Sequence, residues 1–181
     1  MFRIFADNVV LPTSDDGVRV APARVDIVGG LITDVLPMSR ALFMADSSGV
    51  IDLGARLLAP SFTNGHTHLA MSAMRGLTGS ALGGNVIEDL FYKVEQHVTS
   101  SDVRAFARMG ALDCLMSGCG AVFDHYYGGL DLALGLKDVG LSGVVALTLQ
   151  DRGGPGRHQW RDQLDATVAL ALDEDLRQAG I

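Results

Sequence analysis

Residues 58–69 of the chain read LAPSFTNGHTHL, an apolar run that ends in two histidines separated by one residue. In an extended strand alternate side chains point to the same side, so Asn64, His66 and His68 would share one face. Residues two apart on a strand are roughly 6.5 Å apart and a Zn–N bond is about 2.0–2.1 Å, so two tilted imidazoles can bind one ion. The pair indicates a metal site, although two unrelated polar residues in a loop would give the same letters.

The composition restricts the partners of the chain. Its 181 residues carry a formal net charge of −7 with a pI near 5.0, which fits one medium domain, or a small domain and part of another. An acidic chain without a Lys/Arg cluster lacks the basic footprint that nucleic acids and anionic membranes need. We expect no signal peptide and no membrane span, and therefore a cytoplasmic protein. Cys114 and Cys119 are expected to be buried thiols rather than metal ligands.

The first 52 residues predict a small β unit. Short β-type runs alternate with turn residues, and the clearest feature is a hairpin over residues 25–35, where Gly29-Gly30 supplies the positive φ angles of a two-residue turn. The other predicted elements are strands at residues 2–5, 9–11, 18–20 and 50–53, and a helical turn at 40–44. So small a sheet has exposed edges. We therefore expect polypeptide from outside these 52 residues to complete it.

After the histidines, helical and apolar β patterns alternate. Residues 72–84 predict a loop, and two capping boxes, at 85–88 and 99–102, predict helix starts. The remaining predicted elements are strands at 120–124 and 143–149, a helix at 130–139, a loop at 150–158 and a helix at 160–178. Apolar strands that alternate with helices favour an α/β fold with a parallel sheet covered by helices.

In a (β/α)8 barrel, functional groups collect at the carboxyl ends of the strands. Here those ends carry His66/His68, Asp124/His125 and Gln150/Asp151. A whole barrel takes roughly 250 residues, so about three of its eight units fit into this chain. The sequence therefore predicts an incomplete barrel.

Five further side chains are candidates to contact substrate or to orient a metal ligand. The alternative for Asp124 and His125 is a turn cap and an ordinary hydrogen-bonded imidazole. For the other three it is simple solvation at the surface. The candidates are Arg75, Asp124, His125, Gln150 and His158.

Several segments resemble the amidohydrolase superfamily, within its branch of deaminases and triazine chlorohydrolases. They are APSFTNGHTH (59–68), MRGL (74–77), TSSDV (99–103) and LMSGCGAVFD (115–124). Two departures are mild, because neither touches the histidine pair. Ser61 stands where that family usually has glycine, and Gly-Cys-Gly at 118–120 replaces a Gly-Thr-Thr type sequence.

The resemblance implies that residues 1–57 are the N-terminal part of a small β-sandwich and that 58–181 begin a (β/α)8 metal-dependent hydrolase barrel. It implies that His66 and His68 bind one divalent metal, with zinc the first expectation and iron the alternative. Two more histidines, an aspartate and the general acid/base are then expected beyond residue 181. The 181-residue chain is expected to be inactive alone.

By the same resemblance, the reaction is hydrolysis of C–N or C–Cl bonds in an amino- or halo-substituted N-heterocycle by metal-activated water. The expected partner is a small heterocyclic substrate, and a homo-oligomer stays open. Two alternatives remain, namely a non-catalytic metal-binding or assembly module and a functionless remnant of such an enzyme.

Overall fold

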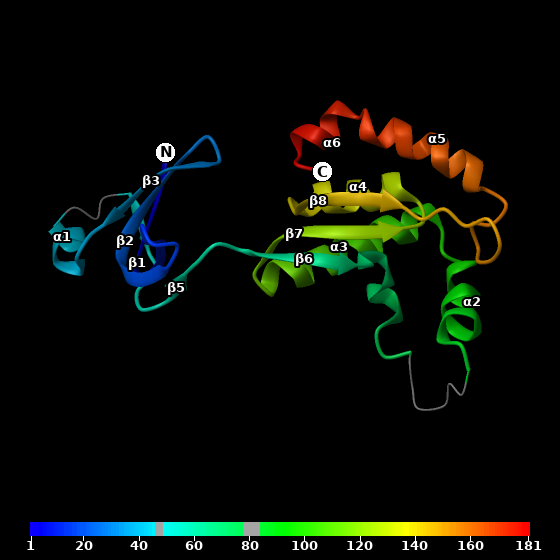
Figure 1. Cartoon of the computed structure of the whole chain (residues 1–181), viewed down its shortest axis with the longest axis horizontal. Coiled ribbons are helices and arrows are strands. Elements are labelled where there is room, and N and C mark those ends of the chain that lie inside the picture. The colour runs from blue at the N-terminus through cyan, green and yellow to red at the C-terminus, as the bar shows by residue number, and fades with distance from the viewer. Residues whose placement is uncertain (46–48, 78–83) are drawn as a thin grey trace. The chain divides into compact units, whose positions relative to one another are not determined.

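The computed structural model describes residues 1–45, 49–77 and 84–181, and the chain divides into two compact units, Met1–Pro60 and Ser61–Ile181 (Figure 1). The sequence placed the boundary between residues 57 and 58. The observed division comes later because Leu57–Leu58 pair with the first strand of the N-terminal unit.

The N-terminal unit is built on one five-stranded sheet of order β3-β2-β1-β4, with β5 also paired to β1. The pairs β1/β2 and β2/β3 are antiparallel, whereas β4 and β5 run parallel to β1. The elements are β1 (Phe2–Pro12), β2 (Val18–Val28), β3 (Leu31–Pro37), α1 (Arg40–Ala45), β4 (Val50–Asp52) and β5 (Leu57–Leu58). Whether this sheet is part of a sandwich stays a prediction.

The hairpin predicted at Gly29-Gly30 is confirmed, with φ angles of 59° and 82° at the two glycines. The two short strands predicted at 2–5 and 9–11 are instead one strand, β1. A register shift between Ala6 and Val9 lets it continue without a turn, because the one extra residue of β1 is absorbed as an irregularity in the ladder.

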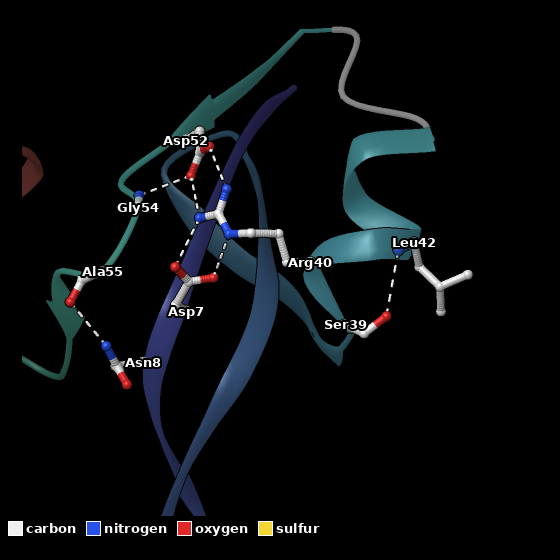
Figure 2. A network of polar contacts seen from close by, with 8 residues as sticks. All are labelled: Asp7, Asn8, Ser39, Arg40, Leu42, Asp52, Gly54 and Ala55. Atoms are coloured by element: carbon white, nitrogen blue, oxygen red, sulfur yellow. Dashed lines mark hydrogen bonds and ion pairs between the residues drawn. The ribbon is translucent and has the colours of Figure 1, made fainter.

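Arg40 fastens α1 to the sheet, as Figure 2 shows. Its guanidinium donates to both carboxylate oxygens of Asp7, at 2.7 and 2.9 Å, and to both of Asp52, at 3.0 and 3.1 Å. These carboxylates raise the pKa of Arg40 above its usual value. Beneath the ion pairs the ring of Phe5 stacks on that of Phe43, with the two ring centroids 4.2 Å apart, and both side chains are buried.

The second unit contains a parallel three-stranded sheet of order β6-β7-β8. Its strands are β6 (Phe62–Thr67), β7 (Cys119–Tyr126) and β8 (Ser142–Leu147). The helical elements are the 3-10 helix η1 (Leu69–Met74), the π-helix η2 (Ile87–Phe91), α2 (Tyr92–Glu95), α3 (Ser100–Met116), α4 (Gly129–Val139), α5 (Trp160–Ala171) and α6 (Glu174–Gln178). The predicted order of strands and helices, and the parallel sheet, are confirmed.

The core of this unit lies between the sheet and the helices α3 and α4. Val122 and Tyr126 of β7 point into it, alongside Val103 and Ala107 of α3 and Leu136 of α4. The start of α3 follows the predicted capping box, since the side chains of Thr99 and Asp102 each bond the other residue's backbone N–H. Helix packing therefore covers one face of β7 and leaves the alternate residues on the other face.

Three local predictions need correction or restriction. The box at 85–88 does not form, because Asn85 accepts the N–H of Ile87 instead and a π-helix follows. The helix predicted at 160–178 is two helices, since the Asp173 side chain caps a new one by accepting the N–H of Leu176. The first residues of the loop predicted at 72–84 belong to the helix η1 instead. Residues 78–83 of that predicted loop lie outside the described residues. In the part of the chain that is described, no helix has the length and apolarity to cross a membrane.

Candidate metal centre

His66 and His68 converge at the carboxyl end of β6. Their Nε2 atoms are 3.3 Å apart and their ring planes are nearly perpendicular, at 80°. The β6/β7 ladder shifts register between Asn64 and Thr67. Asn64 therefore leaves the face it was predicted to share and contacts Cys114 of α3. The two histidines meet as expected, without the asparagine.

The backbone around His68 is held from two sides. Asp124 of β7 accepts the N–H of Leu69 at 2.7 Å. From the helix side, α3 approaches so closely that a Cβ added at Gly110 would stand 2.6 Å from the Leu69 carbonyl oxygen. The position of His68 is therefore fixed by β7 and α3 together, because its neighbour cannot shift without breaking one of these contacts.

The imidazole of His68 is also oriented from β7. Its Nδ1 lies 2.8 Å from the backbone carbonyl oxygen of His125. A carbonyl can only accept, so Nδ1 must carry the hydrogen, and in the neutral ring the lone pair then lies on Nε2. That lone pair is directed toward His66. This tautomer is the one in which Nε2 can bind a metal.

Asp124 is fully buried behind the histidines. Burial raises the pKa of Asp124 to about 7, against the opposing effects of the Leu69 N–H and the charge of His66. Its Oδ1 atom has no hydrogen-bond partner among the described residues. A buried oxygen without a partner is costly, so this site is suited to a nearby positive charge.

His125, the residue after Asp124, joins the pair. Its Nδ1 lies 3.1 Å from Thr148 Oγ1. One ligand atom from each of His66, His68 and His125 lies within 4.8 Å of the other two. Burial lowers the pKa of His125, and the charges of His68 and His66 lower it further, so its neutral form is favoured.

A cavity of about 260 Å³ opens beside this cluster. Aromatic and aliphatic side chains supply most of its wall, and the polar groups are few. It is lined by His68, Met71, Ile87, Phe91, Tyr92, Glu95, His125, Tyr126, Tyr127, Thr148 and Gln150. Such a lining, mostly apolar with a few placed polar groups, is typical of small-molecule sites.

Glu95 anchors a polar network in the wall of this cavity. It accepts hydrogen bonds from the hydroxyls of Tyr126 and Tyr127, while Gln150 donates its side-chain amide to Tyr127. Glu95 is buried, and burial raises its pKa. Glu95 is not predicted as a site residue from the sequence, because an acidic residue beside Val94 in a helical pattern looks like part of a solvated face.

The other candidates are placed differently. Gln150 lines the cavity with the histidines, as a site residue would. Arg75 lies outside that cavity and forms an exposed ion pair with Asp113. His158 lines an adjoining cavity of about 630 Å³ and accepts from Arg157 Nε at 2.8 Å. That cavity shares Tyr92, Glu95, Tyr126 and Tyr127 with the first but is lined by none of the three clustered histidines. Thr148, which orients His125, was not a candidate, since a threonine after an apolar strand carries no distinctive pattern.

The clustered residues fit a divalent metal. Imidazole nitrogens suit zinc and iron, and three histidines each bring one ligand atom to within 4.8 Å of the other two. Two solved structures of similar fold contain zinc. One is an adenosine deaminase from Xanthomonas campestris, with a TM-score of 0.72 at 20% identity over 97% of this chain and 40% of that one. The other is an atrazine chlorohydrolase from Arthrobacter aurescens, with a TM-score of 0.65 at 20% identity over 84% of this chain and 37% of that one. This likeness shows the fold, the N-terminal part of an amidohydrolase (β/α)8 barrel.

The sequence comparisons agree. A curated relative, the 5-methylthioadenosine/S-adenosylhomocysteine deaminase of Haloarcula marismortui, is 29% identical over 71% of this chain and 30% of its own length. The chain thus spans about a third of the length of such relatives. The model of the Amidohydrolase family matches residues 57–178. Because that match covers most of the sequence, including His66, His68 and the whole parallel sheet, the chain belongs to the amidohydrolase family.

Proposed function

We propose that this chain carries part of the active site of a metal-dependent hydrolase, in which His66 and His68 bind a divalent ion, with zinc first and iron second. The substrate class is an amino- or halo-substituted N-heterocycle. The observation that carries the proposal is the 3.3 Å separation of the two Nε2 atoms. Two nitrogens that share a tetrahedral zinc at about 2.0–2.1 Å stand roughly 3.3–3.4 Å apart.

His66 and His68 would hold the divalent ion, which would supply hydroxide at neutral pH by lowering the pKa of its water to about 7. The protein's own groups do the rest. The His125 carbonyl holds the His68 tautomer, and Asp124 holds the Leu69 backbone. The lining of Ile87, Phe91 and Tyr92 excludes water and accepts a flat ring.

Polar groups across the cavity are placed to recognise the ring's edge. Gln150 donates to the hydroxyl of Tyr127, and Glu95 holds that hydroxyl from behind. The order Gln150, Tyr127, Glu95 fixes the direction of each hydrogen bond, so these groups are held in one orientation in the cavity wall. Preset dipoles of this kind favour one orientation of a bound ring.

Names of relatives support the substrate class. The relatives act, by name, on adenosine-type nucleosides and on atrazine, all amino- or halo-substituted N-heterocycles. Because the chain spans about a third of such relatives, the leaving group and the remaining ligands stay predictions, as does the inactivity of the 181-residue chain alone. A homo-oligomer and a cytoplasmic location are likewise untested predictions.

The test uses the native polypeptide, purified from its source with its mass and metal content measured. Release of ammonia and chloride is followed with adenosine, 5-methylthioadenosine and atrazine. His66→Ala and His68→Ala should each abolish metal content and turnover, whereas His97→Ala, on an exposed helix end, should change neither. Full metal and activity in both variants would contradict the ligand assignment. Stoichiometric metal with no turnover on any substrate would favour the metal-binding module instead.

A further inference from the structure

We infer that His125 is a third metal ligand, so that the ends of β6 and β7 form a three-histidine site for Zn²⁺ within this chain. The inference rests on the proposed function, because it takes His66 and His68 as the first two ligands. It goes beyond it, because it gives these 181 residues a metal site of their own.

The three rings lie close together. The His125 ring centroid lies 4.4 Å from that of His68, with the planes at 80°, and 5.9 Å from that of His66. Ligand atoms of all three lie within 4.8 Å of one another. In residues 1–45, 49–77 and 84–181, this is the one group of three or more His, Cys, Asp or Glu side chains close enough to hold an ion.

Each of two rings has a partner on its other nitrogen. His68 Nδ1 donates to the His125 carbonyl, and His125 Nδ1 lies at Thr148 Oγ1, a hydroxyl that can accept its hydrogen. Metal-binding histidines almost always donate their second N–H to such a group, which orients the ring and fixes the tautomer. Nε2 of both rings is then left for the ion.

Strand alternation explains why His125 is available. Val122, Asp124 and Tyr126 of β7 are buried, while Phe123 and His125 are exposed between them. The core against α3 and α4 therefore uses one face of β7 and leaves His125 on the other, beside the end of β6. Three protein ligands plus water is also the number that catalytic zinc sites use, which two histidines alone do not reach.

The test is isothermal titration of Zn²⁺ into the metal-free 181-residue chain, repeated with Co²⁺ so that visible absorption reports the ligand set. We expect one ion per chain. His125→Ala should weaken Zn²⁺ binding by roughly 100-fold or more, and Thr148→Val by about tenfold, the range expected when a ligand's orienting contact is lost. His125→Asn, closer in size, is a second variant should His125→Ala fail to fold, and circular dichroism checks each protein.

Matched controls come from the rest of the chain. His97→Ala and His158→Ala remove the two histidines outside the group and should leave the affinity unchanged. Cys114→Ser with Cys119→Ser should leave the Co²⁺ spectrum unchanged, because no thiolate is a ligand. Unchanged Zn²⁺ affinity in His125→Ala and His125→Asn, with binding lost in His66→Ala and His68→Ala, would overturn the third ligand and keep the proposed pair. No binding by the unaltered chain would overturn the three-histidine site alone, because the proposed pair by itself does not reach the ligand number of a catalytic zinc site. Equal binding in all variants would overturn both.

Discussion

Two clusters of polar side chains differ in how their hydrogen-bonding groups are paired. In the N-terminal unit, Arg40 stands between two carboxylates, so every close contact pairs a donor with an acceptor (Figure 2). At the end of β6, imidazole nitrogens face one another, and a buried carboxylate oxygen of Asp124 behind them has no partner among the described residues. In the first cluster each N–H meets a carboxylate oxygen, whereas in the second, nitrogens that can bind a metal converge on one another.

The pKa values follow the same division. The carboxylates raise the pKa of Arg40, whereas burial and the neighbouring histidines lower the pKa of His125. The positive charge of Arg40 is therefore stabilised in the first cluster, whereas a positive charge on His125 is disfavoured in the second. Such a cluster is a candidate for ligand binding, because natural proteins rarely leave buried polar groups unmatched without a function.

The largest effect should come from supplying the cation. Zn²⁺ at 100 times its dissociation constant should stabilise the folded chain by about 2.7 kcal/mol, because it binds the folded state alone. Urea unfolding with and without Zn²⁺ measures this. His68→Ala should lose the whole increment, and Arg40→Met should keep it. Equal stabilisation in His68→Ala would place the ion elsewhere.

The next effect should come from the helix that supports the site. Gly110→Val would drive a side chain into the Leu69 backbone, and overpacking of this kind costs roughly 1–3 kcal/mol of unfolding free energy. Zn²⁺ affinity should fall with it, since Leu69 adjoins His68. Gly153→Ala is the matched control, because nothing lies within 4 Å of its added Cβ. If the two variants unfold at the same urea concentration, the close approach of α3 is not a constraint.

A smaller effect should follow pH through Glu95. Its pKa in the folded chain is raised from 4.5, so the folded state binds its proton more tightly than the unfolded state. This contribution to stability is fully present below pH 4.5 and is lost as pH rises through the raised pKa. Relative to Glu95→Gln, which keeps an acceptor for Tyr126 and Tyr127, the unaltered chain should therefore lose stability as pH increases. Parallel pH curves would contradict the shift.

The smallest effect is expected in the Arg40 cluster. Arg40→Met should lower the unfolding free energy only slightly, because these ion pairs are partly exposed and screened by water. The loss should shrink further at high salt. Urea unfolding at low and high NaCl measures both. A loss equal to that of Gly110→Val would mean that the network carries more of the unit's stability than its exposure implies.

Sequence reasoning found what depends on local pattern. His66 and His68 were paired from the two-residue period of a strand, and Thr99 with Asp102 from a capping box, because both signals involve residues close along the chain. The order of strands and helices predicted a parallel sheet, and hence that Asp124 and His125 come near the β6 histidines.

What could not be predicted depends on distant contacts. The partnership of Glu95 with Tyr126 and Tyr127 joins α2 to the end of β7, and neither element's pattern marks it. Asn64 was placed with the histidines because alternation cannot foresee a register shift. The neighbours of Arg75 and His158 also depend on distant contacts. Arg75 pairs with Asp113 and lines a cavity with His68, and His158 lines the cavity that adjoins the histidine site.

The hydrogen bond from His68 to the His125 carbonyl links residues 57 positions apart, with all of α3 between them. An ion bound by both His68 and His125 would act as a cross-link that closes the long loop between them. Closing a loop of this size removes unfolded-state entropy, much as a disulfide does. A chelator added to such a protein would then behave as a mild denaturant, opening the α3 segment before it disturbs the N-terminal sheet.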